Sequence, residues 1–214
     1  MKTEIPKPTL ARLVKLSRLL EQIANTEGEN AVISSTEIEK LTGWTRDTVR
    51  RDISFLNASC AKAGGYDVLL LKQTIQSRIA VQTGEAKCCL VGLGRLGEAL
   101  INYGGFDGTA FSLVAGFDSS VNRTEILSAP FPLYTTTKMQ AVIAAQNIEY
   151  AILAVPSSAA QSTAQKLAEY GIKGIVNFTP VVLSLPANIK IENVSVLDAL
   201  QKLAAERAVL GEKK

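Results

Sequence analysis

Apolar residues recur every three to four positions near the start of the chain, which is the spacing of one face of a helix. This pattern covers residues 9–24, with apolar side chains at positions 10, 13, 16, 19, 20 and 23. A shorter helix is expected over residues 36–41, because Ser34 and Glu37 have the spacing of a capping box. Gly43 follows this helix and can end it.

The next predicted helix, over residues 46–57, is basic. Thr45 is suited to cap it, and Val49, Ile53 and Leu56 form its apolar stripe. A short helix, a turn with glycine and a basic helix predict a helix-turn-helix, whose second helix enters the major groove of DNA. The alternative is a small helical domain with ordinary surface charge. The candidate DNA contacts on this segment are Thr45, Arg46, Thr48, Arg50 and Arg51.

A turn followed by a strand is predicted within residues 60–75. This arrangement suits the wing of a winged helix, with Lys62 near the phosphate backbone. Residues 73–81 are expected to form a linking helix, and residues 83–85 to mark the domain boundary. Two residues near the start of the first helix complete the candidate DNA contacts, namely Lys7 and Arg12.

A glycine turn between two strands is the most specific motif of the chain. Residues 87–91 form an apolar strand, and Gly92-Leu93-Gly94-Arg95-Leu96-Gly97 follows at once and opens a helix over residues 98–103. A second apolar strand, residues 111–117, ends in Asp118. Strand, glycine turn, helix, strand and acid in this order predict a dinucleotide-binding unit.

Each glycine of this turn has a separate task in such a unit. Gly92 permits the tight turn, Gly94 lets the backbone approach the pyrophosphate, and Gly97 allows close packing of helix and strand. Asp118 lies 21 residues beyond Gly97, as expected for the acid that binds the ribose 2′-hydroxyl. A carboxylate there repels a 2′-phosphate, which favours NAD(H) over NADP(H). The residues that could still serve a phosphate are Ser119, Ser120 and Arg123.

Strands and helices continue to alternate beyond Asp118. A helix is expected over residues 139–145, a strand over 149–155, a helix over 159–170 and a strand over 174–178. This alternation predicts a doubly wound parallel sheet, whose ligands bind at the carboxyl ends of the strands. Beside the glycine turn, the candidate nucleotide contacts at these ends are Asp118, Val155, Pro156, Asn177, Phe178 and Thr179.

The last predicted helix, residues 194–210, carries apolar side chains at positions 196, 197, 200, 203, 204 and 208. Such an apolar face must be buried against another element. Packing on its own domain and packing on a partner subunit both remain open.

Charge is unevenly distributed along the chain. Residues 1–80 contain 12 Lys and Arg against 9 Asp and Glu, whereas residues 81–214 contain 11 of each. The formal charge of +3 therefore lies on the N-terminal part, which favours a polyanion as its partner. The N-terminus lacks the apolar core of a secretory signal, and no apolar run has the length of a membrane span. We therefore expect a cytoplasmic protein without a membrane partner.

The residue types that are missing from the chain limit the reactions and the metal sites that it could support. The chain has no histidine, which removes the commonest general base and the usual metal ligand. The three cysteines, Cys60, Cys88 and Cys89, have no metal-type spacing and are expected to be buried and reduced. No catalytic residue and no metal site is predicted. An enzyme would have to use Tyr103 or Lys173 as its acid.

Further motifs occur in an order that points to one family. They are Ile5-Pro6-Lys7, Val49-Arg50-Arg51-Asp52-Ile53-Ser54, the Val91–Gly97 turn, Asn102-Tyr103-Gly104-Gly105-Phe106, Phe117-Asp118, Val155-Pro156 with Ala160-Gln161, and the run Gly171–Val181. In these motifs the chain resembles, almost from end to end, the Rex family of redox-sensing transcriptional repressors.

This resemblance implies an α/β homodimer whose winged helices bind a palindromic operator on double-stranded DNA. NADH would close the dimer and release DNA, whereas NAD+ would permit binding, so NAD(H) is an effector that is not consumed. The implied domains are a winged-helix DNA-binding domain over residues 1–82 and a Rossmann-type NAD(H)-binding domain over residues 83–192. Residues 193–214 would form a dimerisation helix that is domain-swapped onto the partner.

The resemblance also implies a redox switch, from which the chain departs. A tyrosine near the nicotinamide, an arginine on the first helix and an aspartate that opens the swapped helix form this switch in the family. Tyr103 and Arg18 match the first two, but Ser195 stands where the aspartate is expected, and Asp198 lies one helical turn further on. A neutral hydroxyl cannot give Arg18 a charge-assisted partner, so weaker discrimination between NADH and NAD+ is expected. The other departures concern single positions. Val196 replaces the aromatic or bulky residue that is expected beside the nicotinamide, and Asn57, Cys60 and Ala63 stand where the family has glycines in the wing.

Three other interpretations remain. One is a small NAD-dependent oxidoreductase, and another is a Rex-like regulator that does not distinguish NADH from NAD+. The third is a module that binds coenzyme A or another nucleotide. Asp118 argues against coenzyme A, since a ribose-binding acid has no obvious use beside its 3′-phosphate.

Overall fold

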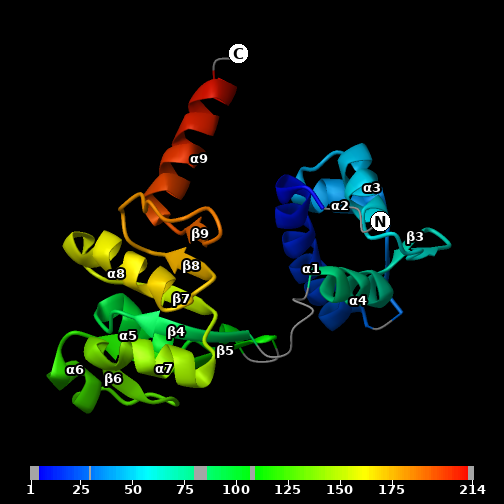
Figure 1. Ribbon diagram of the computed structural model, residues 1–214. Helices are drawn as coiled ribbons and strands as arrows, with labels where there is room; N and C mark the ends of the chain where they lie inside the picture. The colour runs from blue at the N-terminus through cyan, green and yellow to red at the C-terminus, as the bar shows by residue number, and fades with distance from the viewer. Residues whose placement is uncertain (1–4, 29, 80–85, 107–108, 212–214) are drawn as a thin grey trace. The chain divides into compact units, whose positions relative to one another are not determined.

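The computed structural model describes residues 5–28, 30–79, 86–106 and 109–211. Its two compact units comprise Met1–Gly84 and Glu85–Lys214. The first unit is mainly helical and the second combines a sheet with helices (Figure 1). The domain boundary predicted at residues 83–85 lies outside the described residues, and the division into 1–82, 83–192 and 193–214 stays a prediction.

Helices from distant parts of the sequence share one core in the first unit. Leu13, Leu16 and Leu20 of the first helix pack with Ile38 and Leu71 from two later helices. The small sheet is antiparallel, with its strands in the order β1-β3-β2. The elements are α1 (Lys7–Glu27), β1 (Val32–Ile33), α2 (Ser35–Thr42), α3 (Arg46–Ser54), β2 (Ala61–Lys62), β3 (Gly65–Asp67) and α4 (Val68–Ile79).

The predicted starts of α2 and α3 are confirmed. The Ser34 hydroxyl accepts the N–H of Glu37, and the Glu37 carboxylate accepts the N–H of Ser34, which completes the capping box. Gly43 ends α2 in the left-handed conformation. The Thr45 hydroxyl accepts the N–H of Thr48 at 3.3 Å and so caps α3. Both sides of the turn between the two helices are therefore fixed by local hydrogen bonds.

The strand predicted within residues 60–75 is only partly right. β3 ends at Asp67, and the apolar run that follows it opens α4 instead of forming a strand. Val68, Leu71 and Ile75 are spaced three and four residues apart and are buried in the core of the first unit. A short apolar run fits both a strand and a helix, and here the helical spacing decides.

Most helix bounds differ from the prediction by one to three residues, and the largest difference is at the start of α4. The helix expected over residues 73–81 already begins at Val68, and residues 80–81 lie outside the described residues. α3 ends at Ser54 rather than at Asn57, whose φ of 50° takes the chain out of the helix.

The second unit contains a six-stranded parallel sheet among its described residues, with the order β6-β5-β4-β7-β8-β9. The direction of winding reverses between β4 and β7, which is where ligands bind in such sheets. The strands are β4 (Ala86–Val91), β5 (Phe111–Asp118), β6 (Leu133–Thr135), β7 (Tyr150–Leu153), β8 (Gly174–Asn177) and β9 (Lys190–Asn193). The helices are α5 (Arg95–Ile101), α6 (Val121–Ile126), α7 (Met139–Gln146), α8 (Ser157–Glu169) and α9 (Val196–Gly211).

Alternation along the strands assigns each helix to one face of the sheet. On β4, Cys89 and Val91 belong to the core that includes residues of α7 and α8, whereas Leu90 belongs to the core that includes Ile101 of α5. Helices therefore cover both faces, and the predicted doubly wound parallel sheet is confirmed. Cys88 is also buried, and all three cysteines are free thiols as predicted.

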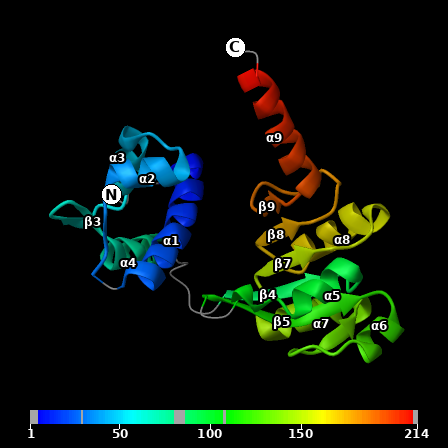
Figure 2. The same ribbon diagram turned by 180° about the vertical axis from the view of Figure 1, so that it is seen from behind.

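The C-terminal helix α9 follows β9 and extends away from the sheet of its unit (Figure 2). Its apolar side chains are exposed, with exposed fractions of 77% for Val196, 63% for Leu197, 58% for Leu200 and 61% for Leu203. The apolar face of this helix is therefore not buried on its own unit.

Candidate nucleic-acid interface and nucleotide-binding edge

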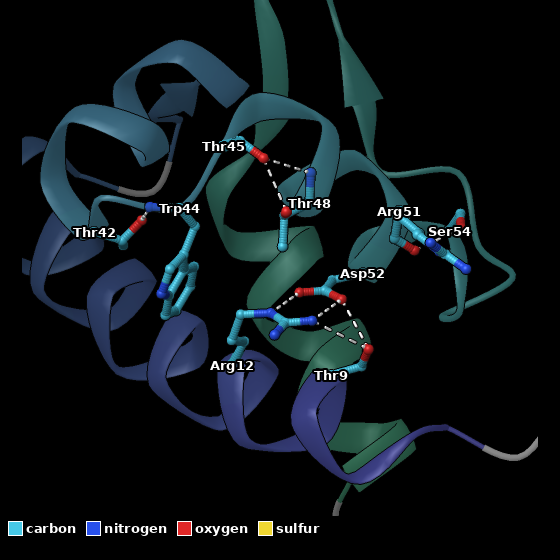
Figure 3. Close-up of polar contacts among 9 residues, drawn as sticks. All are labelled: Thr9, Arg12, Thr42, Trp44, Thr45, Thr48, Arg51, Asp52 and Ser54. Atoms are coloured by element: carbon cyan, nitrogen blue, oxygen red, sulfur yellow. Dashed lines mark hydrogen bonds and ion pairs between the residues drawn. The ribbon is translucent and has the colours of Figure 1, made fainter.

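The start of α3 presents polar and basic side chains, some of which Figure 3 shows. The hydroxyls of Thr45 and Thr48 lie 2.9 Å apart. Arg50 and Arg51 are exposed, whereas Val49 and Ile53 are buried. The helix therefore has an apolar face in the core and an exposed face that carries arginines, as the sequence pattern predicts.

Arg46, also on the exposed face of α3, pairs with Glu39 of α2 at 3.3 Å. Both side chains are exposed, and an exposed pair contributes only about 0–1 kcal/mol. The Arg46 guanidinium can therefore exchange this carboxylate for a phosphate at little cost.

A buried acid connects α3 to α1. Asp52 is 3% exposed and lies on the buried face of α3 between Val49 and Ile53. Its Oδ1 accepts the Thr9 hydroxyl and the Arg12 Nη2, both at 2.9 Å, and its Oδ2 accepts the Arg12 Nε (Figure 3). Because both oxygens are paired, the carboxylate holds the basic helix against α1.

This cluster changes the interpretation of Arg12, which the sequence suggests as a DNA contact. The guanidinium faces Asp52, and the hydrogen bond between them raises the pKa of Arg12. Its side chain is 29% exposed, so only part of it remains available to a phosphate. Sequence reasoning missed the cluster, although the placement of Asp52 among apolar positions of α3 is a signal for a buried, paired acid.

Lys62 is exposed on β2 of the hairpin, where its Nζ is 3.1 Å from Asp67. The pKa of Asp67 is lowered, first by the N–H of Leu70 and then by Lys62. Gly65 faces the backbone of Ile33, where an added Cβ would lie 2.4 Å from the carbonyl oxygen. The hairpin therefore needs glycine at position 65, and β2 and β3 pair although alanine stands at position 63. Lys62 and Lys7 are exposed, as candidate phosphate contacts must be.

The glycine turn has the geometry predicted from its sequence. Gly92 has φ +97°, and an added Cβ would lie 2.4 Å from the Ala154 carbonyl oxygen. At Gly97 an added Cβ would lie 1.9 Å from the carbonyl oxygen of Gly92. At Gly94, by contrast, no heavy atom lies within 4 Å of the Cβ position. Gly92 and Gly97 are thus required by the fold, whereas Gly94 faces open space.

The first turn of α5 starts at this open position. Gly94 is its N-cap residue, and Arg95 and Leu96 are exposed. The first N–H groups of a helix have no partner within the helix, and they carry a partial positive charge. The turn can therefore receive an anionic group such as a diphosphate.

Asp118, at the end of β5, is tied to the same turn. Its Oδ2 accepts the N–H of Leu93 and its Oδ1 accepts the N–H of Ser120, both at 2.8 Å. Arg123 Nη1 lies 3.4 Å from Oδ2. The side chain is 5% exposed, but a carboxylate has about four acceptor positions, so it can also accept ribose hydroxyls.

The other predicted contacts lie at the same edge of the sheet. Ala154 and Val155 adjoin Gly92, as the distances from its Cβ position show. The N–H of Phe178 bonds to the carbonyl of Leu153, which places the start of the next loop beside the end of β7. Pro156, Asn177 and Thr179 complete this edge, where Asn177 and Thr179 are buried and bonded to each other.

The predicted switch residues occupy three different elements. Arg18 is exposed on α1, and Tyr103 is exposed after α5, with its ring 5.7 Å from that of Phe106. The Ser195 hydroxyl accepts the N–H of Asp198 at 3.1 Å and so caps α9. The capping role of Ser195 is readable from its Ser-x-x-Asp spacing.

Two negative findings concern the described residues. Within them, no three His, Cys, Asp or Glu side chains are grouped so that they could hold a metal ion. None of their helices combines the length and the apolar character that are needed to cross a membrane.

Comparison with known proteins connects both sites to one family. Family models described as "CoA binding domain" and "Putative DNA-binding protein N-terminus" match residues 83–181 and 4–54. The redox-sensing transcriptional repressor Rex of Lactobacillus acidophilus is 36% identical, with 94% of each chain covered. That of Leuconostoc citreum is 34% identical, over 94% of this chain and 91% of the relative.

Solved structures give the same result. The chain is similar to RSP in complex with beta-NADH, with a TM-score of 0.84 and 27% identity over 99% of this chain and 100% of that chain. It is also similar to RSP in complex with beta-NAD+ and operator DNA, with a TM-score of 0.82 and 27% identity over the same shares. A further structure of RSP, similar at a TM-score of 0.82, is described as that of a Rex-family repressor. By the identity and the extent of these matches, the chain belongs to the Rex family of redox-sensing transcriptional repressors.

Proposed function

We propose that this chain is a transcriptional repressor that binds a palindromic operator, and that NAD(H) bound at the glycine turn controls this binding. One observation carries the proposal: Gly94 opens onto free space at the start of α5, in a chain whose first unit carries a basic helix-turn-helix. The relatives named as redox-sensing repressors support it, as do the structures of RSP with NADH and with NAD+ and operator DNA.

The nucleotide fits the residues that are present. Residues 92–97 would hold the diphosphate with backbone N–H groups, and Asp118 would accept the hydroxyls of the adenosine ribose. The ends of β7 and β8, with Val155, Pro156, Phe178 and Thr179, would face the nicotinamide half, with Tyr103 beside it. NAD(H) would bind as an effector that supplies redox information, and the protein would carry out no reaction on it.

Two charged groups decide which nucleotide fits, because Arg123 offsets some of the charge of Asp118. We favour NAD(H) over NADP(H), since the carboxylate itself still repels a 2′-phosphate. Coenzyme A is a second candidate, which the description of the family model over residues 83–181 suggests. The position of Asp118 at the end of β5 favours a ligand with free ribose hydroxyls.

Operator binding would use the exposed face of α3 and the hairpin of β2 and β3. The proposed contacts are Thr45, Arg46, Thr48, Arg50, Arg51, Lys62 and Lys7. Arg12 would contribute only through the part of its guanidinium that is not paired with Asp52. A palindromic site requires two copies of the helix, related by a two-fold axis. We propose that α9 provides the dimer contact, swapped onto the partner subunit, because its apolar side chains are exposed on the single chain.

The relatives are regulators by name, and we propose that this chain is likewise no enzyme. A chain without histidine offers Tyr103 or Lys173 as its acid, and Lys173 is paired with Glu149. Because a bacterial repressor has to reach the chromosome, we place the protein in the cytoplasm. At position 195 a serine replaces the expected acid, so we propose that NADH and NAD+ differ less in their effect on DNA binding than in a switch with an aspartate.

Fluorescence anisotropy of a labelled palindromic duplex tests this function. The duplex should be of the type expected for the family, and protein is added without nucleotide, with NADH and with NAD+. The proposal predicts saturable binding that NADH weakens, with little or no NADH consumed over the titration. If the duplex is bound no better than a scrambled one, a selection from random sequence decides. Failure of that selection contradicts operator binding, and equal affinity at all NADH concentrations contradicts control by the nucleotide.

A further inference from the structure

One buried amide joins two parts of the second unit. Asn177, at the end of β8, is 1% exposed. Its Nδ2 donates to the carbonyl of Val181 and to Oδ1 of Asn193, both at 2.9 Å. Its Oδ1 accepts the N–H and the hydroxyl of Thr179 at 3.0 and 2.7 Å. An amide offers two donor hydrogens and two acceptor lone pairs, so this side chain has no hydrogen-bonding position left for a ligand.

The first segment that this amide holds is the loop of residues 178–181. The loop leaves the carboxyl end of β8, at the edge of the sheet where a nucleotide binds. It starts beside β7, because the N–H of Phe178 bonds to the carbonyl of Leu153 at 3.0 Å. Two of its residues, Thr179 and Val181, bond directly to Asn177. The hydrogen bonds of this amide therefore fix the conformation of the loop.

The second segment is the start of α9. Asn193 ends β9, and the N–H of Val194 bonds to the carbonyl of Asn177 at 2.9 Å. Two residues beyond Asn193, the Ser195 hydroxyl caps α9. A displacement of the loop must therefore either break hydrogen bonds of a buried group or move the first residues of α9. Leaving a buried polar group unpaired is costly, so the second response is favoured.

We infer that Asn177 is a positioning residue that transmits the state of the nucleotide-facing loop to the start of α9 through Asn193. This inference rests on the proposed function, since it requires a nucleotide at this edge of the sheet. It adds a route from that nucleotide to the exposed apolar helix that runs entirely within one unit of one chain. Asn177, which the sequence suggests as a nucleotide contact, has no side-chain hydrogen-bonding group left for the nucleotide and would act on it only through the loop.

Hydrogen–deuterium exchange of the full chain, with and without NADH, tests this route without using DNA. In the unmodified chain, NADH should change exchange both in residues 178–185 and in residues 196–206. Asn193→Ala removes the acceptor for Asn177, and the change should persist in the loop but be lost in α9. Asn193→Asp keeps an acceptor oxygen at this position and should restore the response of α9.

Gln161→Ala is the matched control. The Gln161 amide bonds to both the N–H and the carbonyl of Ser184, at 2.9 and 2.8 Å. It therefore ties a later part of the same connection to α8 rather than to β9, and its removal should leave the response of α9 intact. If α9 still responds fully to NADH in Asn193→Ala, the route through Asn193 is refuted. If NADH changes exchange nowhere in the unmodified chain, the proposed nucleotide site fails and the route with it.

Discussion

Replacing two glycines of the same turn by alanine should have opposite consequences. In Gly97→Ala the new Cβ would lie 1.9 Å from the Gly92 carbonyl oxygen, so the turn or the helix must move by more than an ångström. Forced overpacking of this kind typically costs about 1–3 kcal/mol, and we expect about 3 kcal/mol because the neighbour is backbone. In Gly94→Ala the new Cβ has no heavy atom within 4 Å, so stability should change by less than about 1 kcal/mol.

Gly94→Ala should nevertheless weaken nucleotide binding, although it hardly changes stability. Its added methyl group would occupy the space that a diphosphate needs to reach the N–H groups at the start of α5. Loss of two hydrogen bonds to a charged group, at about 1.5 kcal/mol each, corresponds to roughly a hundredfold weaker binding of NADH. The two variants therefore separate the requirement of the fold from the requirement of the ligand.

Urea unfolding and NADH fluorescence measure these two effects separately. The single tryptophan, Trp44, lies in the first unit, so its fluorescence follows that unit, whereas far-UV circular dichroism follows both units. Gly97→Ala should shift the dichroism transition and leave the tryptophan transition in place. Normal NADH affinity in Gly94→Ala would refute the assignment of this position to the diphosphate. Unchanged stability in Gly97→Ala would refute the close packing.

Three further predictions concern other parts of the chain. Asp52→Ala leaves the guanidinium of Arg12 without its partner. This should lower the free energy of unfolding of the first unit by about 2–3 kcal/mol, which is less than the cost of breaking a fully buried pair. An unchanged urea midpoint, followed by tryptophan fluorescence, would contradict this. Burial raises the pKa of the Cys88 thiol to about 11. As the pH rises, the thiol therefore loses its proton in the unfolded chain before it does so in the folded chain. The free energy of unfolding should fall between about pH 9 and pH 11, by up to about 1.4 kcal/mol per pH unit for each such thiol. Cys88→Ala should show a shallower fall, and an identical pH profile would argue against it. Ser195→Asp should keep the cap of α9, since aspartate caps a helix as well as serine. It should increase the difference between the effects of NADH and NAD+ on the affinity for the duplex. An unchanged difference would show that position 195 does not limit the discrimination between NADH and NAD+.

Most of the second unit is predictable from its sequence because several local signals agree there. Apolar runs, the glycine turn and the acid at the end of β5 specify strand, turn and helix in the same order. The sequence pattern does not predict the short strands β6 and β9 or the helix α6, because a few residues in a mixed polar segment show no period. The sequence predicts a strand for the apolar run at the start of α4, because the residues of α1 against which this run packs lie far away in the sequence.

The candidate site shows the same division. The tasks of Gly92 and Gly97 follow from spacing, and the distances at their Cβ positions agree with them. The sequence could not show that Asn177 turns all of its hydrogen-bonding groups inward, or that Asp52 binds Arg12. Both depend on residues that only the folded chain brings together. A polar residue at a position that the apolar period assigns to the core is the one sequence signal for such networks.

The coupling between nucleotide and DNA is tested most directly by a closed thermodynamic cycle on the unmodified chain. The affinity for a palindromic duplex is measured without nucleotide and with saturating NADH, and the affinity for NADH is measured without and with saturating duplex. If NADH controls operator binding, both affinities must fall by the same factor, because the coupling free energy is reciprocal; we expect a factor of about 5 to 150. A factor of one on both sides, with each ligand still binding, would contradict the account.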